Sequence, residues 1–173
     1  MFRFFNHLPS FLFPILWPFM QYGVFVTIPI VSVVALMARK TRLFFLLLVG
    51  GIGIYFAARS IKELVPRGRP GVLVDDAIER EVFAAWSTGF TSGHTAVAAT
   101  IATFAHSYLS KRWQVISIST LVIVAIGRMY VGAHLPLDVL GGMALGVGVA
   151  SSVNFILGVP IHSSTMKEDR EKE

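Results

Sequence analysis

The sequence contains no cysteine among its 173 residues, so disulfide bonds and thiolate metal sites are excluded. It is also poor in charge: charged residues make up 14% of the chain, against about 25% in soluble domains. Hydrophobic residues make up 54%, and the mean hydropathy is +0.68. A chain with this balance belongs in a membrane, and its length allows one compact domain.

The net charge of +5 does not indicate a nucleic-acid partner. The basic residues stand at the ends of hydrophobic segments and in one loop, whereas a nucleic-acid binder gathers them along one soluble face. We therefore expect the bilayer, and no nucleic acid, as a partner.

Five stretches are long and apolar enough to cross about 30 Å of hydrocarbon. They lie at about 19–38, 43–64, 94–109, 113–130 and 137–157, and the third is short. The prediction is an all-α integral membrane bundle of five helices. Glycines in two of these stretches predict close helix packing, at Gly50, Gly51, Gly53, Gly142 and Gly146.

Residues 1–18 are rich in phenylalanine and tryptophan but are interrupted by Pro9, Pro14 and Pro18. Three prolines disfavour a straight span, so an interfacial segment with an aromatic anchor is expected, with a sixth span as the alternative. The main domain is then expected at 19–160, followed by a polar tail at 161–173.

Basic loops suggest an orientation, because short loops rich in lysine and arginine are typically cytoplasmic. With five spans, three basic regions fall on one side, namely 39–42, 111–112 and the tail. The N-terminus, the loop 65–93 and the turn 130–136 fall on the opposite, non-cytoplasmic side. Within the long loop, Asp75 to Trp86 has apolar residues at helical spacing, which predicts an amphipathic helix on the membrane surface. A solvated lid without substrate contact is the alternative.

Several ionisable residues lie at the ends of these spans, on the predicted non-cytoplasmic side. They are Lys62, Arg69, His94, Arg128, His134 and Asp138. A charge at bilayer depth costs about 2.5–3.5 kcal/mol, and the three cations would repel one another. Their convergence is explained if they bind an anion, and phosphate suits arginine forks and lysine point charges.

Two histidines have neighbours that suit catalysis. His134 and Asp138 are four residues apart, so a carboxylate can orient one ring nitrogen and leave the other nucleophilic. His94 follows Ser92 and Gly93 at a helix start, where backbone N–H groups can face an oxyanion. Without a nearby carboxylate in sequence, His94 suits a general acid.

These elements resemble the three-part signature of the type 2 phosphatidic acid phosphatase (PAP2) superfamily. The first motif, K-x6-R-P, matches Lys62 to Arg69-Pro70. The second, P-S-G-H, matches the stretch from Thr91 to His94, with threonine in place of proline. The third, S-R-x5-H-x3-D, matches the stretch from Arg128 to Asp138, with Gly127 in place of serine. The resemblance covers roughly half of the chain.

The resemblance implies a role for each matched residue. Phosphate would be held by Lys62, Arg69, Arg128, Ser92 and Gly93. His134 would attack phosphorus to form a phosphohistidine, Asp138 would orient it, and His94 would protonate the leaving oxygen and then activate water. No metal and no cofactor are implied.

We therefore predict a metal-independent phosphatase of a membrane lipid phosphate, such as a polyprenyl (di)phosphate, for example undecaprenyl diphosphate, or a phosphatidylglycerophosphate. The expected location is a bacterial inner membrane, with the site on the non-cytoplasmic side. Two alternatives stay open. One is a phosphotransferase that passes the phosphate to a hydroxyl acceptor, and the other is a non-catalytic lipid-binding or transport protein.

Overall fold

The computed structural model describes residues 1–81 and 88–159, and all regular elements in these ranges are helical. Three helices come first, α1 (Phe2–Asn6), α2 (Phe13–Met20) and α3 (Thr27–Met37). Next, α4 (Thr41–Phe45) continues through a π-helical turn (Leu46–Gly50) into α5 (Gly51–Leu64). The remaining helices are α6 (Pro70–Leu73), α7 (Gly93–His106), α8 (Lys111–Tyr130) and α9 (Pro136–Ile156). The predicted all-α bundle is confirmed.

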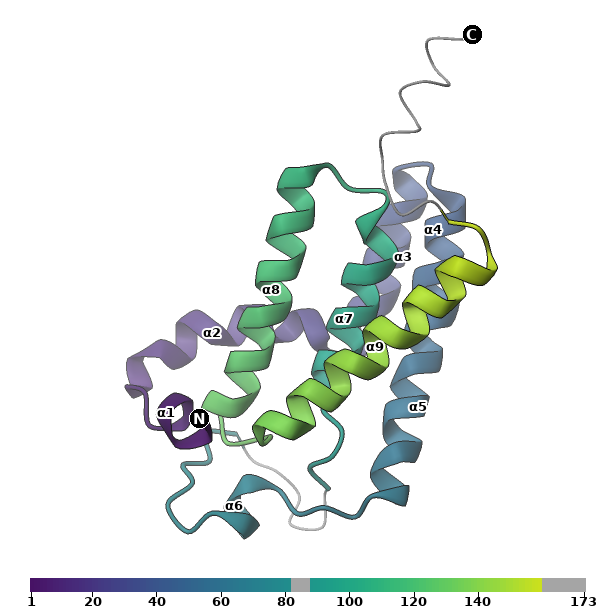
Figure 1. The fold of residues 1–173 in the computed structure, drawn as a ribbon. Coiled ribbons are helices and arrows are strands. Elements are labelled where there is room, and N and C mark those ends of the chain that lie inside the picture. Colours follow the sequence, from purple (N-terminus) through teal and green to yellow (C-terminus); the bar gives the residue numbers. More distant parts are fainter. Residues whose placement is uncertain (82–87, 160–173) are drawn as a thin grey trace, which may run out of the picture.

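Helix α7 forms the centre of the bundle and packs against α5, α8 and α9 (Figure 1). Nine of its 14 residues are buried, and alanines among them allow close approach. On α9, a side chain at Gly142 would meet the Ser92 carbonyl, and one at Gly146 would meet the Ala96 carbonyl. The predicted close packing at these two glycines is confirmed, and it fixes the start of α9 against the start of α7.

The glycines of the second expected span differ among themselves. A side chain at Gly50 would meet the Phe104 ring, and one at Gly51 would lie 2.7 Å from Ile28 Cγ2, so both positions require close packing. Gly53 has no heavy atom within 4 Å of the position that a Cβ would take. The packing prediction is therefore wrong for Gly53, which faces open space.

Three helical stretches have the length and hydropathy of membrane spans: Thr41–Leu64, Lys111–Tyr130 and Pro136–Ile156. They coincide with the second, fourth and fifth expected spans. A fourth candidate is the pair Ser10–Gly23 and Thr27–Met37, which is bent by 69°. Helix α7, the third expected span, has 14 residues, and at about 1.5 Å per residue it is shorter than the hydrocarbon core.

The first expected span, 19–38, is not one straight helix. A break at residues 21–26 separates α2 from α3, and Thr27 Oγ1 donates a hydrogen bond to the Gln21 carbonyl at 2.6 Å across it. Gly23 lies in this break against the backbone of His94, where a Cβ would meet His94 Cα at 2.9 Å. As a result, α1 and α2 lie across α8 (Figure 1) and bring the N-terminal segment to the start of α7.

The two ends of the bundle have different loops. At one end, Lys40 Nζ donates to the Tyr108 carbonyl at 2.6 Å, and Arg42 donates to the Leu157 carbonyl. The basic loops therefore meet the end of α9 on one side, as the five-span arrangement predicts. The opposite end holds the C-terminal ends of α5 and α8, the N-terminal ends of α7 and α9, and α6 (Figure 1).

The amphipathic helix expected at 75–86 is wrong for its described part, because residues 75–81 form turns and irregular structure. Their backbone groups bond to other segments. Ile78 N donates to Asn6 Oδ1 at 2.7 Å, and Arg80 N donates to the Val131 carbonyl at 3.0 Å. Residues 82–86 of the expected helix lie outside the described residues.

Candidate active site

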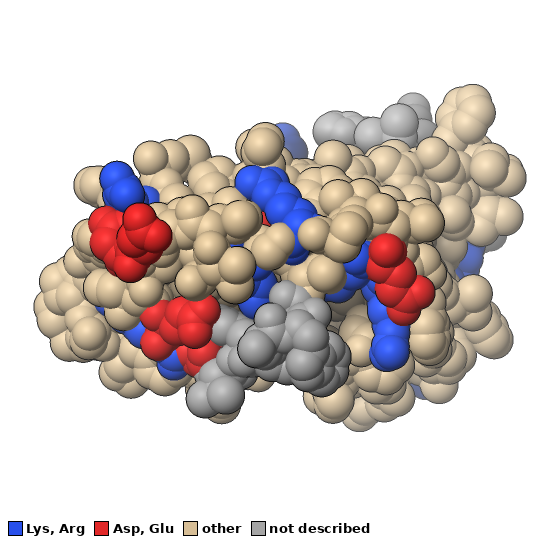
Figure 2. All heavy atoms as spheres, turned by 90° about the horizontal axis from the view of Figure 1, so that it is seen from below, with Lys and Arg blue, Asp and Glu red and all other residues tan. Residues whose placement is uncertain are grey.

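The candidate site lies at the end of the bundle where α5, α7, α8 and α9 come together. Lys62 is in the last turn of α5, His94 in the first turn of α7, and Arg128 in the last turn of α8. Seen from this end, charged side chains of both signs gather on one face (Figure 2). The segments that carry the three sequence motifs are thus brought to one place by helix packing.

His134 lies in the turn between α8 and α9, two residues before α9 begins at Pro136. After the end of α8 at Tyr130 the chain turns at Gly132, whose φ of +78° is a conformation that favours glycine. The amides of Ala133 and His134 then donate to the Arg128 carbonyl at 3.1 and 3.2 Å. This turn links the position of the imidazole to that of Arg128. His134 therefore lies before α9, whereas Asp138 lies in the first turn of that helix.

Asp138 is completely buried beneath His134. Its Oδ2 atom accepts a hydrogen bond from Leu135 N at 2.7 Å and lies 4.0 Å from His134 Nδ1. The Nδ1 atom has no hydrogen-bond partner within the described ranges. The carboxylate therefore faces one ring nitrogen, as the sequence predicted, at a distance longer than a hydrogen bond. The other ring nitrogen, Nε2, is left for a substrate.

Positive charges surround His134. Burial lowers the pKa of its imidazole well below 6.5, and the charges of Arg128, Lys62, Arg69 and His94 lower that pKa further. The sequence predicted these four residues to be neighbours of His134, and they are close enough to influence the charge of its imidazole. The result is a neutral imidazole, which is the form that can act as a nucleophile.

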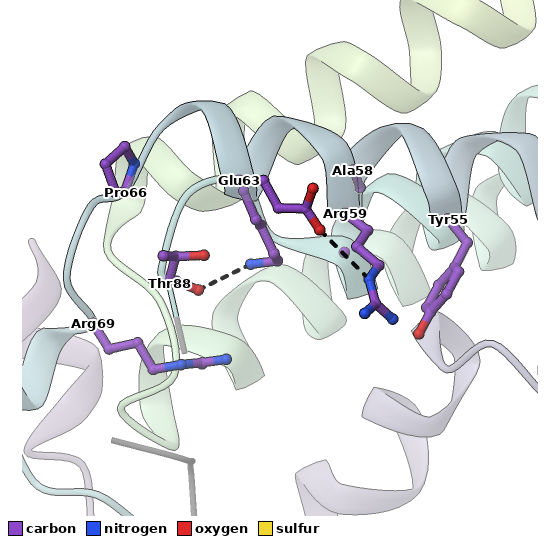
Figure 3. Close-up of a pocket in the computed structure, with 9 residues that line it drawn as sticks. Tyr55, Ala58, Arg59, Glu63, Pro66, Arg69 and Thr88 are labelled. Atoms are coloured by element: carbon purple, nitrogen blue, oxygen red, sulfur yellow. Dashed lines mark hydrogen bonds and ion pairs between the residues drawn. The ribbon is translucent and has the colours of Figure 1, made fainter. Parts of the chain in front are cut away.

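Two of these cations have backbone partners. Lys62 Nζ donates to the carbonyls of Thr88 and Gly89 at 3.1 and 3.3 Å, and Figure 3 shows the bond to Thr88. Arg69 Nη1 donates to the Ala133 carbonyl at 2.9 Å. Burial and the Arg128 charge lower the pKa of Arg69. These contacts hold Lys62 beside the segment before α7 and Arg69 beside the turn that carries His134.

Arg128 is almost completely buried and forms an ion pair with Glu81. Its Nη1 atom donates to Glu81 Oε2 at 2.8 Å, and the Glu81 side chain is partly exposed. An acidic side chain from the long loop therefore contacts a cation that the motif predicts to bind phosphate. The sequence had placed Glu81 on the polar face of a surface helix, so this pairing was missed.

Ser92 and Gly93 form the start of α7. The Ser92 amide donates to the Asp138 carbonyl at 2.9 Å, so this N–H is already used by the protein. The Ser92 hydroxyl is buried without a hydrogen-bond partner within the described ranges. A Cβ at Gly93 would meet no heavy atom within 4 Å, so the helix start faces open space there. These two residues can therefore offer a hydroxyl and the positive end of a helix to an anion.

A cavity of about 530 Å³ opens beside the cations. Figure 3 shows Arg59, Arg69 and Thr88 at its walls, with Tyr55 at one side. The lining residues come from α5, the loop that follows it and the segment that leads into α7, namely Tyr55, Ala58, Arg59, Lys62, Glu63, Pro66, Arg69, Thr88 and Gly93. The cavity volume exceeds what one phosphate group needs, so a larger part of a ligand fits next to Lys62 and Arg69.

Arg67 is a second residue whose partner the sequence did not predict. Its Nη1 atom donates to Asp138 Oδ1 at 3.1 Å. The available signal was its place in the sequence, two residues before Arg69. Within residues 1–81 and 88–159, no three His, Asp or Glu side chains come together in a way that could hold a metal ion.

The fold and the site together are those of a membrane-embedded phosphatase. Residues 39–157, which include all the candidate site residues, match the family model of the PAP2 superfamily. The chain therefore belongs to the PAP2 superfamily, and it is an integral membrane hydrolase of phosphoric esters.

Two solved structures share this fold. LpxE of Aquifex aeolicus is 23% identical, with a TM-score of 0.75, and the match covers 87% of this chain and 90% of that one. A transmembrane PAP2-type phosphatidylglycerolphosphate phosphatase from Bacillus subtilis is 25% identical, with a TM-score of 0.72, and the match covers 92% and 84%. No curated protein sequence is significantly similar to this chain.

Proposed function

We propose that the protein hydrolyses the phosphate of a membrane lipid through a phosphohistidine on His134. The observation that carries this proposal is the buried imidazole of His134, which lies beside a carboxylate and near three cations at the end of apolar helices. The cations would bind the phosphate oxygens, while the tail of the substrate stays in the bilayer. The similar Bacillus subtilis structure is named for a lipid substrate, which supports this class.

The reaction would proceed in two steps. His134 Nε2 attacks phosphorus and a P–N bond forms. The P–O bond to the lipid breaks as His94, which is protonated once the substrate phosphate offsets the nearby cations, gives its proton to the leaving oxygen. His94 then takes a proton from water, whose oxygen attacks phosphorus and releases inorganic phosphate from His134. Lys62, Arg69 and Arg128 would stabilise the charge on the phosphoryl oxygens in both steps, together with Ser92 and the Gly93 amide.

The cavity supports a substrate with a small headgroup or a second phosphate. It lies along α5 between Tyr55 and Lys62, and its volume of about 530 Å³ leaves room beyond one phosphate. Polyprenyl phosphates, polyprenyl diphosphates and phosphatidylglycerophosphate fit this description. We place the site on the non-cytoplasmic side of a bacterial inner membrane, because Lys40 and Arg42 lie at the opposite end of the bundle.

A substrate panel tests this proposal. Purified protein in liposomes would be given polyprenyl monophosphate and diphosphate, phosphatidylglycerophosphate and a soluble sugar phosphate, with and without an added lipid alcohol. We expect inorganic phosphate from at least one lipid, inhibition by vanadate, and no loss of activity in a metal chelator. Faster hydrolysis of the soluble ester than of every lipid would contradict the lipid assignment, and phosphate found on the alcohol would indicate a transferase.

A further inference from the structure

Arg67 forms an ion pair with the carboxylate beneath the proposed nucleophile. Its Nη1 atom lies 3.1 Å from Asp138 Oδ1. The Arg67 side chain is about one-third exposed (32%), whereas the Asp138 side chain is 0% exposed. A fully buried carboxylate without a charged partner is strongly unfavourable. Arg67 therefore supplies a directly paired positive charge for the buried Asp138 carboxylate.

The two oxygens of Asp138 have separate partners. Oδ1 accepts from Arg67, while Oδ2 accepts from the Leu135 amide and lies 4.0 Å from His134 Nδ1. Rotation of the carboxylate out of its present plane would break both bonds. The Arg67 contact thus fixes the carboxylate plane and leaves Oδ2 as the atom that faces the imidazole.

Arg67 is itself held by the backbone that runs past Asp138. Its carbonyl accepts a hydrogen bond from Gly89 N at 2.7 Å. A Cβ at Gly89 would lie 2.9 Å from the Gly68 carbonyl and 3.2 Å from Asp138 Oδ2. The absence of a side chain at Gly89 lets this segment lie against both the Arg67 loop and the carboxylate, so the ion pair is enclosed by main chain.

We propose that Arg67 is a positioning residue for the phosphorylation of His134, acting by fixing Asp138 so that Oδ2 can accept the Nδ1–H of the imidazole. This inference rests on the proposed function, because it requires His134 to be the nucleophile. As Nε2 bonds to phosphorus, positive charge develops on the ring, and an oriented carboxylate stabilises it. Arg67 contacts the carboxylate and not the phosphate, so its effect falls on the chemical step and not on substrate binding.

The test uses Arg67→Gln and Arg67→Lys in the full-length protein, with the lipid phosphate that the panel identifies. We expect Arg67→Gln to lower kcat roughly 10- to 100-fold, the scale on which lost orientation slows catalysis. KM should change less than about twofold, because the cations that bind the substrate phosphate in the ground state are unchanged. Arg67→Lys keeps the charge and should recover part of kcat. Arg3→Gln, which breaks the exposed Arg3–Asp76 pair at 3.0 Å, is the matched control and should keep the native kcat.

A double-mutant cycle with Asp138→Asn tests whether Arg67 acts through Asp138 or independently of it. If Arg67 acts through Asp138, adding Arg67→Gln to Asp138→Asn lowers kcat no further.

Each measured rate is divided by the folded fraction of the protein, determined by size-exclusion chromatography. If Arg67→Gln does not fold, Arg67→Lys is used for the test. An increase in KM with an unchanged kcat would show that Arg67 binds phosphate and would overturn the inference, as would an unchanged kcat. Native activity in His134→Ala would instead overturn the proposed function.

Discussion

Glu81 Oε2 accepts a hydrogen bond from Arg128 Nη1 at 2.8 Å, so a carboxylate of the protein contacts a cation of the candidate phosphate site. A substrate phosphate that binds Arg128 must compete with this carboxylate. The Arg128 side chain is 5% exposed and the Glu81 side chain 24% exposed, so this pair is mostly buried and stronger than a surface salt bridge. Glu81 therefore weakens the binding of an anion to Arg128.

Replacement of Glu81 by glutamine should strengthen anion binding. We expect Glu81→Gln to lower the Ki of vanadate by about fivefold or more, because the carboxylate that competes for Arg128 is removed. The measurement is inhibition of lipid phosphate hydrolysis over a range of vanadate concentrations. Asp76→Asn removes the same charge from the same loop but from a residue that pairs with Arg3, and its Ki should stay at the native value. A higher Ki in Glu81→Gln would show that Glu81 supports the site.

Ligand-free His134 should stay neutral in mild acid. Burial and nearby cations lower its pKa well below 6.5, so its proton is lost before that of an ordinary histidine as pH rises. The unfolded chain binds a proton below pH 6.5 that the folded chain does not bind, so His134 makes folding less favourable as pH falls below that value. NMR of protein labelled at histidine carbon, assigned with His134→Asn, would follow this titration. Vanadate should raise the pKa by neutralising the cations, and a midpoint at or above 6.5 without ligand would contradict the described site.

A side chain at Gly23 should disturb His94. A Cβ there would lie 2.9 Å from His94 Cα and would meet the His94 carbonyl, so backbone must move. We expect Gly23→Ala to lower kcat roughly 10-fold or more, since small displacements of catalytic groups are costly. Gly53→Ala is the control, because its Cβ enters open space within a helix, and it should keep the native kcat and gain about 0.5–1 kcal/mol of stability. Equal kcat values in the two variants would show that the Gly23 contact does not position His94.

Asn6 should contribute strongly to stability although it lies far from the site in sequence. Its side-chain amide donates to the carbonyls of Ile78 and Tyr130 at 2.8 and 3.1 Å, and its Oδ1 accepts from Ile78 N. Asn6→Ala leaves buried backbone groups without partners, at about 1–3 kcal/mol for each unsatisfied group. The midpoint of thermal unfolding should fall markedly. Asn154→Ala should have little effect, because Asn154 Oδ1 has no partner within the described ranges.

Sequence alone predicted the components of the site better than their contacts. Motif spacing and the alternation of spans placed Lys62, Arg69, His94, Arg128 and His134 at one end of a helical bundle. These residues stand at the ends of hydrophobic segments or in the loops beside them, and hydropathy shows where such segments end.

The contacts that sequence did not predict depend on the path of the long loop. Arg67 meets Asp138 across 71 residues, and Glu81 meets Arg128 across 47. No local pattern encodes such pairs. Likewise, hydropathy does not distinguish a straight span from a bent pair, so the break near Gly23 was missed. The helical spacing after Asp75 was outweighed by hydrogen bonds to Asn6 and Val131.

The central claim, that His134 is the nucleophile, is tested most directly by trapping the phosphoenzyme. Protein would be mixed with a lipid substrate carrying radioactive phosphate, quenched in alkali within the first turnovers, and digested for peptide mapping. We predict an alkali-stable, acid-labile label on the peptide that contains His134, and neither label nor turnover in His134→Asn. Label on another residue, or native turnover in His134→Asn, would contradict the account.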